Sequence, residues 1–175
     1  MILTRDGIQQ AIASGDIIID PFVPDRLGPN SYDFSLGTRC KTYKHLELDS
    51  RSHNLTESCE IDERGIVITP NRLFLFNTAE RIGSARYVPV IRGRSSVARL
   101  GLFIHITADL IDLGSINQLT LQLHSVSPIR IYPGMAIGQV TFWTVKGEIE
   151  LYKGKYSGRT SPCESLSYLD TFHDH

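Results

Sequence analysis

Short apolar segments separated by turn-forming residues constrain the fold of this chain most. Nine such segments are punctuated by glycine, proline, asparagine or aspartate, at residues 17–19, 32–36, 66–68, 73–76, 87–91, 102–106, 119–123, 129–132 and 137–142. Residues 119–123 alternate strictly between apolar and polar, as in a strand with one buried face. Helical spacing occurs only in the first fifteen residues, where Thr4 is placed to cap a helix and Gly15 to end it. The pattern predicts an all-β domain, closed or sandwiched, with a short N-terminal helix.

The 175 residues are enough for one domain and too few for two comfortable ones, so we expect a single domain over residues 1–175. Residues 45–64 are polar and charge-rich, which predicts a surface excursion between strands. The tail from Tyr152 to residue 175 is rich in glycine, serine and basic groups. Composition alone favours a frayed terminus there over a flexible arm that closes on a ligand.

Composition excludes several classes of function. The net charge of −1 argues against a surface for nucleic acid polymers, although a local arginine cluster can still hold a small anion. No apolar run approaches the roughly 18 residues that span a bilayer, and the N-terminus does not resemble a signal peptide. Cys40, Cys59 and Cys163 are odd in number and widely spaced, which predicts neither a disulfide framework nor a zinc site. We expect a cytoplasmic protein that does not bind membranes.

A loop with anion-binding groups, GRSSVAR, follows the fifth apolar segment at residues 93–99. The hydroxyls of Ser95 and Ser96 donate hydrogen bonds, and the guanidinium groups of Arg94 and Arg99 donate with charge. A triphosphate suits such a group, yet the Walker pattern is absent, and a solvated turn with surface arginines is the commoner explanation.

Asp112 lies between Ile111 and Leu113, an apolar setting for a carboxylate. It is either a turn residue that caps its own backbone before Gly114, or an acid that positions a water or a sugar hydroxyl. The residues leave these alternatives even. His105 lies within a strand pattern, where a histidine is more often a satisfied structural group.

The order of these motifs resembles the dCTP deaminase family of the trimeric dUTPase superfamily, nearly end to end. MILTRDGIQQAI is similar to the opening helix of the family, and GPNSYDFSLG to its first motif, with Asp33 at the acidic position. GRSSVARLGL matches the phosphate-binding motif almost letter for letter, and TADLID resembles the stretch with the acid. PGMAIGQVTF, which contains Gln139, resembles the fourth motif, and LYKGKYSGR the C-terminal arm from about residue 152 to 175.

The resemblance implies a distorted, jelly-roll-like β-barrel of the dUTPase type, assembled as a homotrimer with its sites between subunits. It implies a pyrimidine deoxynucleoside triphosphate, dCTP or dUTP, as ligand, with Mg²⁺ bound through the phosphates and no zinc. Several residues are implied to bind the nucleotide. Arg94, Ser95, Ser96 and Arg99 would hold phosphates, and Asp112 would meet the deoxyribose. Backbone atoms of Thr120 and Leu121 would read the base edge, and Tyr152 and Lys155 would close from the arm. The further residues expected to bind the nucleotide are Gln122, Gln139 and Arg159. This reverses the interpretation of the tail from composition.

Three departures from the family bear on activity. Gln122 stands where the deaminases carry the glutamate that shuttles protons, DLGSIN replaces a segment that usually reads D-P-G-(aromatic)-x-G, and Arg159 stands where the arm usually has a glutamine. An amide cannot take up a proton, and general acid–base catalysis contributes about 10²–10⁴-fold. With Gln122, Asp112 and Arg99 as the candidate catalytic residues, diphosphate hydrolysis of dUTP is therefore a better prediction than deamination of dCTP. The alternatives are a catalytically silent nucleotide-binding regulator and an enzyme specialised for a modified base.

Overall fold

The computed structural model describes residues 1–105 and 107–170, and its regular secondary structure consists mostly of β-strands. A single longer helix, α1 (Arg5–Ala13), precedes them. The other elements are, in chain order, β1 (Ile17–Asp20), η1 (Pro24–Arg26), β2 (Tyr32–Tyr43), β3 (Thr56–Glu60), β4 (Ile66–Ile68), β5 (Phe74–Ser84), β6 (Tyr87–Gly93), α2 (Ser95–Ala98), β7 (Leu102–Phe103), β8 (Asn117–Ser125), β9 (Ile129–Ile131), β10 (Ala136–Thr144) and η2 (Ser167–Leu169).

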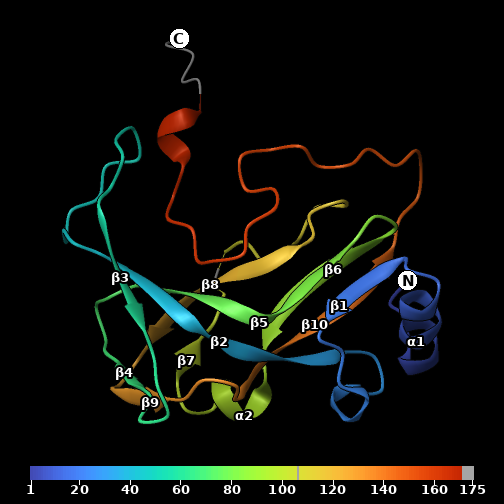
Figure 1. Ribbon diagram of the computed structural model, residues 1–175, viewed down its shortest axis with the longest axis horizontal. Coiled ribbons are helices and arrows are strands. Elements are labelled where there is room, and N and C mark those ends of the chain that lie inside the picture. The colour runs from blue at the N-terminus through green and yellow to red at the C-terminus, as the bar shows by residue number, and fades with distance from the viewer. Residues whose placement is uncertain (106, 171–175) are drawn as a thin grey trace.

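One twisted, antiparallel sheet forms a nearly closed barrel around the core (Figure 1). Its strands follow the order β6-β10-β2-β5-β8-β7, while β1 adds to β5 and β3 adds to β2. Strands β4 and β9 form a separate pair. The prediction of an all-β, barrel-like domain with a short N-terminal helix is confirmed.

Alternating burial explains how β8 can support a site. Its side chains are buried and half-buried in strict alternation from Asn117 to Ser125. Leu119, Leu121 and Leu123 point into the core, because successive residues of a strand face opposite sides. The side chains between them are therefore presented on the outer face of the sheet.

Several local features differ from the sequence-based predictions. Thr4 occupies the N-cap position of α1, but its side chain makes no capping hydrogen bond; Gly15 ends the helix with a φ of 78°, as expected. Residues 56–60 of the predicted excursion form β3, and its Cys59 is disulfide-bonded to Cys40 of β2, against the prediction from cysteine spacing. The predicted strand over 102–106 is limited to Leu102–Phe103, and residue 106 lies outside the described residues.

The C-terminal segment returns across the barrel instead of fraying. In Figure 1 the orange-to-red chain passes over β8 before it reaches η2. Hydrogen bonds fix its course at the backbone of Tyr152, Arg159 and Cys163. The prediction of a frayed terminus is thus wrong for residues 152–170, while residues 171–175 lie outside the described part of the chain. Among the described helices, none has the length and apolar character needed to cross a membrane.

Candidate functional site

A cavity of about 610 Å³ lies between the outer face of β8 and the C-terminal segment. Gln118, Thr120 and Gln122 line it from β8, and Asp112 lines it from the preceding loop. The part of the C-terminal arm between residues 152 and 165 forms its other wall. The volume is in the range of small-molecule sites, so the cavity is the candidate site for a ligand.

Among the polar residues of β8 that line the cavity, Gln122 is the one whose side chain makes no hydrogen bond within the described part of the chain. Gln118 Nε2 donates to the carbonyl of Ala79 at 3.0 Å, and Thr120 Oγ1 accepts from the backbone N–H of Cys163 at 3.1 Å. The Gln122 backbone N–H donates to Ile104, but its side-chain amide has no hydrogen bond among the residues that the structure describes. Gln122 can therefore offer both a donor and an acceptor to a ligand.

Asp112 is exposed, contrary to the buried setting suggested by its apolar neighbours. Its backbone carbonyl accepts the N–H of Ser115 at 3.1 Å, which closes a turn in which Gly114 adopts a φ of 84°. The carboxylate itself caps no backbone group among the described residues and lines the cavity. Of the two interpretations left by the sequence, a carboxylate available to a ligand fits this geometry better.

The arm brings a second set of polar groups to the cavity. The backbone N–H of Tyr152 donates to Leu113 O at 2.8 Å, and its hydroxyl accepts from the N–H of Tyr156 at 3.3 Å. Arg159 is held by its backbone, whose N–H donates to Asn117 Oδ1 at 2.9 Å. Its Nη2 donates to Lys155 O, but its buried Nε has no partner in the described structure. An arginine with an unused buried donor is suited to a ligand oxygen.

His105 also lines the cavity, although the sequence suggested a satisfied structural histidine. Its Nδ1 is buried and has no hydrogen-bond partner among the described residues. Burial lowers the pKa of His105, because removal from water disfavours the charged imidazolium. A neutral ring is therefore the form that faces a ligand at neutral pH.

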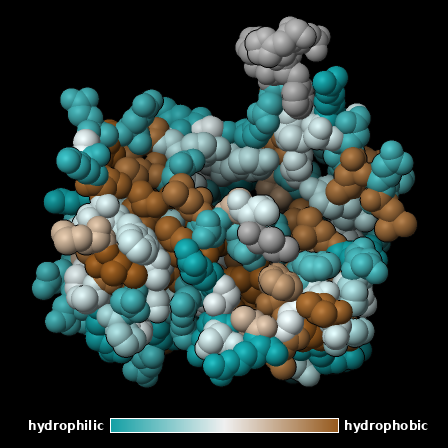
Figure 2. Space-filling view, turned by 180° about the vertical axis from the view of Figure 1, so that it is seen from behind, coloured by the Kyte–Doolittle hydropathy of each residue, from teal (hydrophilic) through white to brown (hydrophobic). Residues whose placement is uncertain are grey.

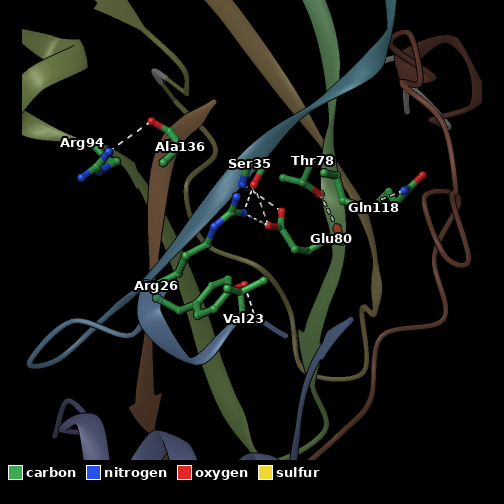
Figure 3. Close-up of polar contacts among 10 residues, drawn as sticks. Val23, Arg26, Ser35, Thr78, Glu80, Arg94, Gln118 and Ala136 are labelled. Atoms are coloured by element: carbon green, nitrogen blue, oxygen red, sulfur yellow. Dashed lines mark hydrogen bonds and ion pairs between the residues drawn. The ribbon is translucent and has the colours of Figure 1, made fainter. Parts of the chain in front are cut away.

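The predicted phosphate-binding motif, residues 93–99, is separate from this cavity. Ser95 and Ser96 begin the one-turn helix α2 and are exposed, as is Arg99 at its end. Arg94 Nε forms an ion pair with Asp33 at 2.9 Å. Figure 3 draws Arg94 and Gln118 on opposite sides of the view, with the Arg26–Ser35–Glu80 cluster between them. None of the four motif residues belongs to the described lining of the cavity.

Three further candidate residues also lie apart from the cavity lining. Leu121 is fully buried in the core, which leaves only its backbone for the predicted role. Gln139 lies on β10, opposite Asp33 of β2 and Arg92 of β6. Lys155 Nζ forms an ion pair with Asp170 at 2.5 Å, and the hydrogen bond from this carboxylate raises the pKa of Lys155.

The described side chains do not form a metal site of their own. No group of three or more histidines, cysteines, aspartates or glutamates is placed to hold an ion, within residues 1–105 and 107–170. Binding of Mg²⁺ through the phosphates of a ligand stays a prediction.

Several residues of the cavity were not found by reasoning from the sequence. Tyr43 and Leu75 contribute from β2 and β5, and Tyr156, Cys163 and Glu164 contribute from the arm. The free thiol of Cys163 has its pKa raised by burial. Tyr156 belongs to the arm motif LYKGKYSGR but was not singled out, and the other four belong to no quoted motif. Only the folded chain brings residues of β2, β5 and the arm to one cavity.

Comparisons with known proteins agree with this description. The dCTP deaminase-like family matches residues 2–145 of the chain. A dCTP deaminase, dUMP-forming, of Clostridium botulinum (strain Alaska E43 / Type E3) is 42% identical over 171 residues, which cover 97% of this chain and 98% of the relative. A protein of the same description from Cytophaga hutchinsonii is 40% identical, with 97% and 98% covered. A dCTP deaminase of Rhodopirellula baltica is 39% identical over 175 residues, with 99% and 88% covered.

The fold is also similar to that of a solved structure. The 2'-deoxycytidine 5'-triphosphate deaminase of Agrobacterium tumefaciens superposes with a TM-score of 0.65 at 19% identity. The match covers 81% of this chain and 47% of the solved chain, so it spans about half of that protein and supports the fold alone. The family match over most of the chain and the relatives near 40% identity lead to one conclusion: the chain belongs to the dCTP deaminase-like family.

Proposed function

We propose that the protein is an enzyme that binds a pyrimidine deoxynucleoside triphosphate and hydrolyses it to the monophosphate and diphosphate. One observation carries the proposal. A single cavity brings together the Asp112 carboxylate, the free Gln122 amide and the polar groups of the arm. Relatives along the whole chain are described as dCTP deaminases that form dUMP, which combines loss of an amine with loss of diphosphate.

The Gln122 amide should affect these two reactions differently. Deamination requires protons to move from water to the ring nitrogen and to the departing ammonia, which a carboxylate can relay and an amide cannot. Loss of such a relay costs about 10²–10⁴-fold in rate, so deamination of dCTP is expected to be slow. Hydrolysis of the triphosphate depends chiefly on positioning and on stabilisation of phosphate charge, and neither requires a proton relay at position 122.

The proposed hydrolysis balances without a further reactant. The oxygen of one water bonds to the α-phosphorus, and the bond from this phosphorus to the α–β bridging oxygen breaks. Diphosphate leaves with the electron pair, and the proton of the water passes to solvent. Asp112 would position the deoxyribose or the water, since its carboxylate faces the cavity without another partner. A Mg²⁺ ion on the phosphates would offset part of their charge.

We infer that the phosphates are held by a second subunit of a homotrimer. The Arg94–Arg99 motif lies outside the cavity of its own subunit, and its Ser95, Ser96 and Arg99 are exposed. A site completed across an interface would use both halves. Exposed apolar side chains beside this motif support an interface there: Leu100 is 62% exposed and Phe103 47%. Figure 2, which shows the molecule from behind, also displays hydrophobic patches between the hydrophilic residues.

Product analysis tests the reaction. The protein is incubated with dCTP and with dUTP in the presence of Mg²⁺, and the products are identified by mass. We expect the nucleoside monophosphate and diphosphate, with little ammonia. Rapid conversion of dCTP to a deaminated product would contradict the role given to Gln122. Absence of any product at high enzyme concentration would contradict the enzyme itself.

A mixing experiment tests the shared site. Asp112→Asn impairs the cavity and Arg99→Ala impairs the phosphate motif, so each homotrimer alone is expected to be nearly inactive. After dissociation and random reassembly of equal amounts, about one site in four combines an intact cavity with an intact motif from a neighbour. Recovery of about a quarter of the wild-type rate is therefore expected. No recovery from a verified mixed assembly would place both halves of the site in one subunit.

A catalytically silent nucleotide-binding regulator is the second candidate. It is favoured by the same observation of a formed cavity with an amide at position 122. Calorimetry that detects binding of dCTP or dUTP, without product by mass, would establish it. Lack of binding by either nucleotide would eliminate it.

A further inference from the structure

Three adjacent strands place Gln122 in a row with Lys41. In the β2–β5 pair Lys41 lies opposite Leu75, and in the β5–β8 pair Leu75 lies opposite Gln122. Residues directly opposite each other in antiparallel strands project from the same face of the sheet. Lys41, Leu75 and Gln122 therefore share the face that the arm covers.

The arm crosses this row at Glu164. The backbone N–H of Cys163 donates to Thr120 Oγ1 at 3.1 Å, and that of Ser165 donates to the Tyr43 hydroxyl at 2.9 Å. Between them, Glu164 Oε2 forms an ion pair with Lys41 Nζ at 2.5 Å. These consecutive contacts hold the Glu164 carboxylate at the end of the cavity that Gln122 also lines.

The Glu164 carboxylate has hydrogen-bonding capacity left for a ligand. Its side chain is only 17% exposed, and Lys41 Nζ pairs with Oε2 at 2.5 Å. His53 Nε2 lies 3.7 Å from Oε1. The two oxygens of a carboxylate offer about four acceptor positions, so Oε1 can still accept a hydrogen bond from a ligand. Burial acts to raise the pKa of Glu164, but the hydrogen bond from Lys41 and the other donors outweigh it and the pKa is lowered. The group is thus an ionised carboxylate, which only accepts hydrogen bonds.

Such an acceptor distinguishes the two pyrimidine bases at their 4-position. Cytosine carries an amino group there, which donates two hydrogen bonds, whereas uracil carries a carbonyl oxygen, which accepts. The Gln122 amide suits either base, because rotation exchanges its donor and acceptor. A fixed carboxylate in the same cavity is complementary to the amino group and repels the carbonyl oxygen. Sites with a fixed hydrogen-bonding demand discriminate strongly against a ligand that leaves it unmet.

We propose that Glu164 determines base specificity, so that the protein prefers a 4-aminopyrimidine nucleotide, dCTP, over dUTP. This inference rests on the proposed function and refines its substrate. Combined with that reaction, it predicts that dCTP and water yield dCMP and diphosphate, with the 4-amino group retained. Glu164 would contact the base, while Lys41 positions the carboxylate.

The ratio of kcat/KM for dCTP to that for dUTP tests the proposal, together with the ratio of the two Kd values. One charge-assisted hydrogen bond corresponds to about 10- to 100-fold discrimination, which is the preference expected for the wild type. In Glu164→Gln the amide can rotate to donate to uracil, so both ratios should fall to about one. Lys41→Met is the matched comparison, because it removes the group that fixes the carboxylate but retains the carboxylate itself. It should weaken the binding of both nucleotides and lower the ratio only in part, so that the ratio stays above the value of about one expected for Glu164→Gln.

Each outcome bears on a different part of the proposal. A wild-type preference for dUTP, or equal losses for both nucleotides in Glu164→Gln with an unchanged ratio, would overturn the role of Glu164. If both nucleotides bind without turnover, the Kd ratio still measures base selection, and only the proposed hydrolysis fails. If neither nucleotide binds, both proposals fail together.

Discussion

The buried hydroxyl of Thr78 connects the two strands that support the cavity, and its removal should destabilise the fold measurably. Thr78 is fully buried on β5, where the pairing with β8 is irregular between Asn77 and Arg81. Its Oγ1 donates to the carbonyl of Glu80 at 2.7 Å and accepts the N–H of Leu119 at 2.9 Å. Figure 3 shows Thr78 and Glu80 with Gln118 close by. The hydroxyl thus replaces ladder hydrogen bonds at this irregularity.

The magnitude follows from the two contacts. Thr78→Val keeps the shape of the side chain but leaves the Leu119 N–H and the Glu80 carbonyl without partners. Each unsatisfied buried group costs about 1–3 kcal/mol, so the loss of both partners should lower the free energy of unfolding by about 2–6 kcal/mol. Against a typical total of about 5–15 kcal/mol, this is a large loss. Thr78→Ser is the matched control, because it keeps both hydrogen bonds and loses one buried methyl, worth about 1 kcal/mol.

Urea unfolding of the three proteins measures the effect, provided that the slope of the transition is unchanged. The valine variant should have the lower midpoint of the two. Nucleotide affinity should fall with it, because Leu119 lies between two residues that line the cavity, Gln118 and Thr120. If Thr78→Ser is destabilised as much as Thr78→Val, side-chain volume and not hydrogen bonding governs this position, and the reasoning is refuted.

Three further predictions concern the reaction, pH dependence and packing. Gln122→Glu should increase ammonia release from dCTP by about 100-fold or more, and an unchanged rate would place the missing proton relay elsewhere. Burial lowers the pKa of His105 below its ordinary 6.5, so the unfolded chain binds a proton more readily than the folded protein. The free energy of unfolding should therefore fall as the pH decreases from 6.5 towards the lowered pKa. In His105→Asn the midpoint of urea unfolding should no longer change with pH in this range. A Cβ at Gly83 would lie 2.3 Å from Ser115 O, so Gly83→Ala should unfold at a clearly lower temperature. A Cβ at Gly7 of α1 would make only ordinary contacts with Leu3, at 3.5 Å or more, so Gly7→Ala should match or exceed the stability of the wild type.

The apolar segments predicted most of the strands, since burial of one face requires a repeated pattern that the sequence displays. The exception is β3, whose residues Thr56–Glu60 are mostly exposed and carry no apolar alternation. It forms because β2 offers a free edge, to which Cys59 is also bonded through Cys40. Pairing of this kind depends on the neighbouring strand and leaves no local signal.

The sequence predicted several residues of the candidate site but not their arrangement in space. The motif resemblance identified Asp112, Gln122, Tyr152 and Arg159, all of which line the cavity. It could not place the phosphate motif outside this cavity, because the distance between the two depends on the tertiary fold. Glu164 was missed for the same reason, since only the returning arm brings it to Lys41, 123 residues earlier in the chain.

Groups of opposite charge lie at the two ends of the part of β8 that lines the cavity. This arrangement suggests that the base and the phosphates are bound at different ends. Arg159 lies beside Gln118 at one end, where its carbonyl accepts the Gln118 N–H, and Glu164 lies over the row of Gln122 at the other. Gln118 and Gln122 are about 13 Å apart at 3.4 Å per residue, enough to separate a base from its phosphates. A nucleotide with its base at Gln122 would direct its phosphates towards the unpaired donor of Arg159. In the homotrimer proposed above, selection of the base would belong to the subunit's own cavity and most phosphate affinity would depend on the neighbouring subunit. Assembly would then control binding without changing the preferred base.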